Sequence, residues 1–159
     1  KKQARAMTLT NAEVAVRQLD QAIRLFLEGD LLSSLTLAGA AEEILGKLCE
    51  RAGRPVSIEQ IVAFHWDDTD PALPDKDRRK ILLAVLNRAR NDVKHANNPD
   101  EATFDLEPDF ALQMIMRAMP MARNLGFPPN REAVMVRWIR EHPEATGGDN
   151  QPVPKGPTS

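Results

Sequence analysis

Residues 31–51 read LLSSLTLAGAAEEILGKLCER, and this stretch decides the fold. Its apolar side chains recur at the spacing of one helical face: Leu31, Leu35, Ala38, Ala41, Leu45, Leu48 and Cys49. The small residues 38–41 would let a neighbouring helix approach closely. At about 100° per residue, Glu42 falls inside this face whereas Glu43 points away from it. A carboxylate buried at Glu42 needs a cation or hydrogen-bond donors, because its lost hydration must be replaced.

Other segments have the same helical spacing, and none has the alternating pattern of a strand. Helices are expected over residues 10–28, 31–51, 57–64, 75 to about 97, 108–125 and 131–141. Short connections between short helices predict an all-α, up-and-down bundle of five to six helices. The bundle should span residues 8–142. Residues 143–159 are rich in Gly, Pro and polar side chains and are expected to be a disordered tail.

Several single residues make the helix predictions specific. Gly29 should end the first helix and Asp30 should cap the second. Ser57 and Gln60 predict a capping box, and Pro120 should kink or split its helix. The side chains expected to face inward in the later helices are Leu82, Val85, Leu86, Ala89 and Val93, then Phe110, Met114, Ala118, Met121 and Leu125, and finally Val134 and Trp138.

Composition excludes several classes of function. The 159 residues include five Phe, two Trp and no Tyr, too few rings for a platform that stacks single-stranded bases. The lone Cys49 rules out an internal disulfide framework or a cysteine-rich metal site, and it is expected to be a buried, inert thiol in a cytoplasmic protein. No apolar run reaches the ~20 residues of a membrane span, and no cofactor or metal is expected.

Charge is distributed unevenly along the chain. The net charge is −2, but residues 75–95 carry seven basic and three acidic side chains, a local +4 that leaves −6 elsewhere. The basic residues are Lys76, Arg78, Arg79, Lys80, Arg88, Arg90 and Lys94. Such a strip on an acidic body favours a focused phosphate contact over a general nucleic-acid coat.

Within that strip, Arg90-Asn91-Asp92-Val93-Lys94-His95 resembles the signature of the HEPN superfamily, the nucleotide-binding domains of higher eukaryotes and prokaryotes. That signature is an Arg, usually followed by a polar residue, with a His five to seven positions later, near the end of a late bundle helix. The segment Ala41-Glu42-Glu43-Ile44-Leu45 is also similar to the family. The resemblance covers residues 10–125, and the helix at 131–141 adds to the usual core.

This resemblance implies an RNA-binding protein or a metal-independent endoribonuclease, often a toxin or defence factor, that acts as a homodimer. An antitoxin or nucleotidyltransferase partner would also fit. It implies Arg90 and His95 as catalytic residues, Asn91 and Glu42 as supporting residues, and Arg88 and Lys94 as RNA-phosphate contacts. His95 titrates near neutrality and could act as base or acid, and the Arg90 fork could hold phosphate oxygens as charge develops.

Helix geometry sets a condition on this site. Five residues at ~100° each place Arg90 and His95 about 140° apart around an ideal helix. The two side chains can converge only if the helix loosens after Lys94 or if a second copy supplies one of them.

An alternative from the same residues is a catalytically silent protein-interaction module. Arg90 would then pair with Glu42 inside the bundle, and His95 would cap its helix. Two of the four methionines Met114, Met116, Met119 and Met121 would lie in the core and two on a partner or dimer seam.

His65 with Asp67, Asp68 and Asp70 forms either a loose divalent-metal cluster or a solvated loop. His142 is expected to be exposed.

Overall fold

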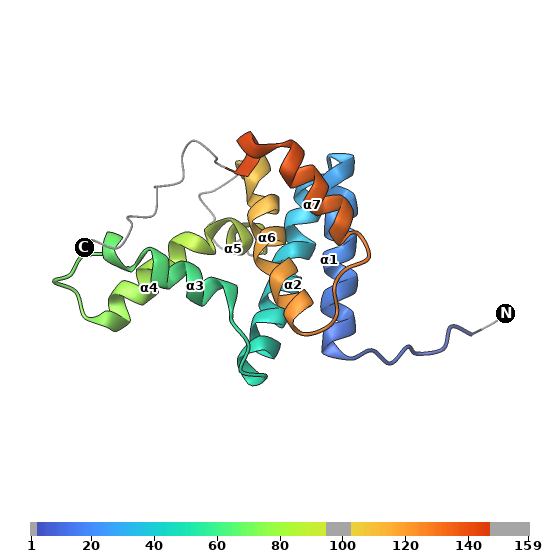
Figure 1. The fold of residues 1–159 in the computed structure, drawn as a ribbon, viewed down its shortest axis with the longest axis horizontal. Helices are drawn as coiled ribbons and strands as arrows, with labels where there is room; N and C mark the ends of the chain where they lie inside the picture. Colours follow the sequence, from blue (N-terminus) through green and yellow to red (C-terminus); the bar gives the residue numbers. More distant parts are fainter. Residues whose placement is uncertain (1–2, 95–102, 147–159) are drawn as a thin grey trace.

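The computed structural model describes residues 3–94 and 103–146, and these form a helical bundle (Figure 1). The α-helices are α1 (Asn11–Glu28), α2 (Leu31–Arg51), α3 (Ser57–Phe64), α4 (Asp75–Leu86), α5 (Arg88–Lys94), α6 (Pro108–Asn124) and α7 (Glu132–Glu141). Two short 3-10 turns, η1 (Trp66–Asp68) and η2 (Pro143–Thr146), complete the described elements. The all-α prediction is confirmed, with no strand in the described residues.

The first two helices form the hairpin that the sequence predicts. Thr10 caps α1, because its Oγ1 accepts a hydrogen bond from the Glu13 amide at 3.1 Å. Gly29 ends α1 with φ of 90°, a left-handed conformation that favours glycine. The Asp30 carboxylate then accepts from the Ser33 amide at 3.1 Å and starts α2.

The core lies between α1, α2 and α6, and α7 packs over it (Figure 1). Its largest fully buried side chains are Leu19, Ile23, Leu35, Leu45, Leu112, Met114, Ile115, Met121 and Met135. Cys49 is buried among them, as predicted, with its Sγ 3.8 Å from the Met121 carbonyl oxygen. Ser34 is also buried, and its hydroxyl donates to the Ala22 carbonyl at 2.7 Å, which joins α2 to α1.

The start of α3 differs from the predicted capping box. Val56 is the N-cap and makes no side-chain capping bond. The Ser57 hydroxyl instead donates to the backbone carbonyl of Arg117 on α6, at 2.7 Å. Burial explains the difference, because a polar hydroxyl facing the core must use the acceptor that it meets there.

The single helix expected from residue 75 to about 97 is wrong. It divides at Asn87 into α4 and α5, and its predicted end at Asn97-Asn98-Pro99 lies outside the described residues. Val85, expected to face inward, is 68% exposed, and no residue of α4 is buried. Ala89 and Val93 of α5 do pack against the core. Figure 1 shows α3 and α4 extending to one side of the bundle.

Helix α6 differs from the predicted split at Pro120 and from the predicted placement of its methionines. Pro120 does not split it, and the ring lies on the exposed side, where water can bond the carbonyl that the missing N–H leaves free. Three of the four methionines, rather than two, are buried in the core: Met114, Met119 and Met121. Only Met116 is exposed.

Of the two residues of helix α7 predicted to face inward, Trp138 does so and Val134 does not. Met135 is fully buried, whereas Val134 is 44% exposed. Trp138 does face the bundle, and its ring meets Phe26 edge-on with centroids 4.8 Å apart. His142 is not simply exposed, because it stacks on Trp138 at 4.1 Å. Residues 135, 138, 139 and 142 share one helical face, so Met135 rather than Val134 continues the Trp138 stripe.

The disordered tail predicted over residues 143–159 is wrong for its first four residues. Pro143–Thr146 form η2, with Ala145 packed against the core, and residues 147–159 lie outside the described residues. None of the described helices has the length and apolar character that crossing a bilayer requires.

The packing of α7 gives a paired test. We expect Met135→Ala to lower the free energy of unfolding by about 3 kcal/mol, because it leaves a cavity in the core. Val134→Ala, its exposed neighbour, should change it by no more than about 0.5 kcal/mol. Urea unfolding followed by circular dichroism measures both, and equal effects would show that α7 does not dock as described.

Candidate functional site

Arg90 of the motif lies against Glu42 of α2. Its Nη1 donates to the Glu42 Oε2 at 2.7 Å. The Glu42 side chain is only 4% exposed and that of Arg90 16%. The ion pair that the sequence predicted inside the bundle is therefore present, and it joins α5 to α2.

Gly39 makes this contact sterically possible. A Cβ at position 39 would lie 2.6 Å from Cγ and 2.9 Å from Cδ of Arg90. Both distances are too short for ordinary contact, so the Arg90 stem crosses α2 at a residue without a side chain. The expectation that small residues in α2 admit a neighbouring helix is confirmed at this position.

A third buried charge, Arg117 of α6, was missed by sequence reasoning. It is 6% exposed. Its Nη2 donates to the Leu86 carbonyl at 2.9 Å and its Nη1 to the Asn87 Oδ1 at 3.2 Å. The carbonyl at the end of α4 thus has a hydrogen-bond donor from outside its own helix, which explains why the helix can divide at Asn87. The available signal was position, because residue 117 falls in the same helical sector as Met114 and Met121.

The three charges influence one another through a poorly hydrated interior. Burial raises the pKa of Glu42, and the nearby charges of Arg90 and then Arg117 oppose that rise. Burial lowers the pKa of Arg117, which the charge of Glu42 opposes and that of Arg90 reinforces. The charges of two guanidinium groups thus act on one buried carboxylate. The Arg90 Nε is buried without a hydrogen-bond partner in the described structure.

The remaining motif residues lie around this cluster. Asn91 and Asp92 are on the exposed side of α5. Arg88, predicted to contact phosphate, is exposed but lies 3.5 Å from Asp92 Oδ2. Lys94 ends α5; its side chain and the whole of His95 lie outside the described residues. The predicted approach of His95 to Arg90 therefore stays a prediction.

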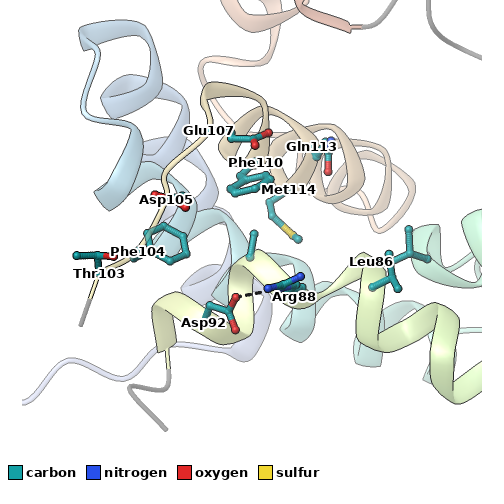
Figure 2. A pocket seen from close by; sticks show the side chains of 12 residues that line it. Leu86, Arg88, Asp92, Thr103, Phe104, Asp105, Glu107, Phe110, Gln113 and Met114 are labelled. Carbon is teal, nitrogen blue, oxygen red and sulfur yellow. Dashed lines mark ion pairs between the residues drawn. The ribbon is translucent and has the colours of Figure 1, made fainter. Parts of the chain in front are cut away.

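A groove of about 680 Å³ runs along the other side of α5 (Figure 2). The rings of Phe104 and Phe110 line one wall, and the Arg88–Asp92 ion pair lies on α5 opposite them. Arg90 does not line this groove, because it faces α2. The groove and the buried charge cluster are therefore separate features.

Much of the predicted basic strip is engaged in internal contacts. Arg78 lies over the Trp66 ring, 4.5 Å from its centroid, and donates to the Thr69 hydroxyl. Arg79 forms a two-bond ion pair with Glu59. Together with Arg88 and Arg90, every arginine of the strip has a partner, so the strip attracts phosphate less than its charge of +4 indicates.

The acidic loop forms local contacts instead of converging. His65 Nδ1 lies 3.0 Å from Asp68 Oδ2, and Asp70 accepts from the Ala72 amide at 2.9 Å. In the part of the chain that the structure describes, no three His, Cys, Asp or Glu side chains are placed to hold a metal ion.

Comparisons with protein-family models, with curated proteins and with solved structures find no match for this chain.

The close approach at Gly39 can be tested against a second glycine of the same helix. Ala normally stabilises a helix interior by about 0.5–1 kcal/mol relative to Gly, and Gly46→Ala should do so because its Cβ meets only Val56 at 3.7 Å. Gly39→Ala should instead destabilise the protein by about 1–2 kcal/mol, since it displaces Arg90. Thermal melts measure both effects. A higher melting temperature for Gly39→Ala as well as for Gly46→Ala would contradict the close contact between position 39 and Arg90.

The burial of Glu42 predicts a pH dependence of stability. Its pKa is raised in the folded state from an ordinary value of 4.5, so the folded state binds more protons and the free energy of unfolding falls as pH rises above that value. Glu42→Gln removes this dependence. The stability of the wild type relative to Glu42→Gln should therefore decrease from pH 4.5 towards pH 7 in urea titrations; an increase would show that the ion pair outweighs burial.

Proposed function

We propose that this chain is a HEPN-like protein that binds RNA through the Arg90 cluster and acts, as a homodimer, as a metal-independent endoribonuclease. The observation that carries the proposal is the buried charge cluster at the motif: Arg90 is paired with the buried Glu42, and the charge of a second buried guanidinium, Arg117, acts on the same carboxylate. Arg90 lies on α5, whose last residue directly precedes His95 in the sequence.

An unbalanced buried charge is unfavourable unless an anion reaches it. Glu43 is nearby but half-buried at the edge of the cluster, where it lies 3.7 Å from Lys47. A phosphate at the exposed part of Arg90 would supply the missing negative charge. Glu42 would then act as a positioning residue that holds the guanidinium through Nη1.

The proposed reaction uses only groups of the protein and the RNA. A base, for which His95 is the candidate, takes the proton of a 2′-hydroxyl, and that oxygen attacks the adjacent phosphorus. The bond from phosphorus to the 5′-oxygen breaks, and an acid gives this leaving oxygen a proton. The products are a 2′,3′-cyclic phosphate and a 5′-hydroxyl. Arg90 would stabilise the charge that builds on the non-bridging oxygens.

The direction of Arg90 supports a homodimer. Because Arg90 is held against α2 and His95 is five residues further on, about 140° around an ideal helix, one copy alone does not bring the two together without loosening the helix. Two motifs facing each other would place the Arg90 of one copy near the His95 of the other.

A specific observation favours the alternative, a non-enzymatic interaction module. The arginines of the basic strip are paired, while Phe64, Ile81 and Val85 of α3 and α4 are exposed apolar side chains. Such a surface is typical of contact with another protein. The two proposals differ in whether the protein binds RNA in a salt-dependent way.

Incubation with a mixed RNA pool in EDTA, beside a His95→Ala variant, tests the enzyme directly. We expect cleavage by the wild type that leaves 2′,3′-cyclic phosphate ends, and a loss of at least about 100-fold in rate in the variant. The thermal melt of the variant should match that of the wild type, which separates chemistry from folding.

Arg90 needs a subtler substitution, because Arg90→Ala would leave Glu42 buried without its cation. Arg90→Lys keeps the charge but loses the planar fork, and it should lower the cleavage rate more than it lowers stability. Full activity of His95→Ala would remove the catalytic role. Absence of both cleavage and RNA binding in folded wild-type protein would favour the interaction module.

A further inference from the structure

The end of α6 and the outer face of α7 enclose an open basic hollow away from the α5 motif. Its volume is about 440 Å³. Arg123 contributes from α6, and Glu132, Ala133, Val136, Arg137 and Arg140 line it from the α7 side. Three of its six lining residues are therefore arginines, against one acidic residue.

The charges of this hollow are only partly paired. Arg123 forms an ion pair with Glu132, with its Nε donating to the carboxylate at 2.6 Å. Arg137 and Arg140 are exposed, and within residues 3–94 and 103–146 neither has a carboxylate within ion-pair distance. They lie three residues apart on one helical face, where Cβ atoms are about 5–6 Å apart. The hollow thus presents two adjacent, uncompensated guanidinium groups.

This arrangement contrasts with the strip at residues 75–95. There, Arg78, Arg79, Arg88 and Arg90 are held by a ring, a hydroxyl or carboxylates. The arginines that remain available to an anion in solution therefore lie outside residues 75–95, the segment in which the sequence concentrates basic residues. Some of them lie on α7, a helix outside the segment that resembles HEPN proteins.

We propose that the α7 hollow is a second contact for the RNA backbone, with Arg137 and Arg140 binding neighbouring phosphates. The inference rests on the proposed function, which it deepens by assigning a role to the last helix. Guanidinium forks match phosphate oxygens. No aromatic side chain lines the hollow, so it lacks a surface for stacking bases, and the contact reads phosphate rather than sequence.

A purely structural role for the same residues is to complement the helix dipole at the C-terminal end of α7, where cations are favourable. That role would affect the stability of the helix but not the binding of RNA. The salt dependence of binding separates the two, because every phosphate contact releases counterions and contributes about 0.7–0.9 to the slope of log K against log salt.

The experiment compares two double variants by fluorescence anisotropy. The probe is a labelled RNA hairpin with 2′-O-methyl groups, which lacks the nucleophile for cleavage. Arg137→Ala/Arg140→Ala removes the proposed contacts. Arg51→Ala/Arg54→Ala is the control, because it also removes two exposed arginines three residues apart, Arg51 at the end of α2 and Arg54 in the loop that follows, and neither lines the hollow.

We expect Arg137→Ala/Arg140→Ala to reduce the salt slope by about 1.4–1.8 between about 50 and 200 mM salt, while the control keeps the wild-type slope. A wild-type slope in Arg137→Ala/Arg140→Ala, or an equal reduction in the control, would overturn the α7 contact but leave the proposed function intact. Wild-type protein without salt-dependent RNA binding would overturn both. Matching thermal melts exclude unfolding as the cause of any loss.

Discussion

Arg117 is the residue on which the arrangement of α3, α4 and α5 depends. Its backbone carbonyl accepts the hydrogen bond from Ser57 at the start of α3, and its guanidinium binds Leu86 and Asn87 at the end of α4. A buried guanidinium is favourable only when its donors are satisfied. The carbonyl of Leu86 and the amide of Asn87 meet that requirement, and in doing so they fix where α4 stops and α5 begins.

The same charge connects this junction to the candidate site. The charges of Arg117 and Arg90 both act on Glu42, a buried residue of α2. Gly39 allows Arg90 to reach that carboxylate. The position of the motif helix is therefore set by polar groups and by one missing side chain, with Ala89 and Val93 adding modest apolar contact. Helices pack more often through apolar side chains than through buried charges. Buried charges that hold one another in place are found more often at functional sites.

Local chemistry explains which parts of the structure could be predicted. Gly29 and Asp30 act through their immediate neighbours, so the turn between α1 and α2 was predicted to the residue. Ser57 and Asn87 form hydrogen bonds with Arg117, which lies sixty and thirty residues away along the chain. No local sequence pattern predicts contacts over such separations. The Glu42–Arg90 pair was predictable because both ends have a clear signal: an acid within an apolar stripe and a cation on a late helix. The charges of Arg78 and Arg79 were misjudged, since their partners Trp66 and Glu59 lie on other elements.

The α3–α4 arm has a consequence for how the molecule moves. α4 has no buried residue and packs mainly on α3 and α5, whereas α1, α2 and α6 share a continuous apolar core. Segments with little buried apolar area open at lower free energy than the global transition. Amide hydrogens of α4 should therefore exchange with solvent through local opening while those of α2 stay protected, and the bundle would keep its core during such excursions.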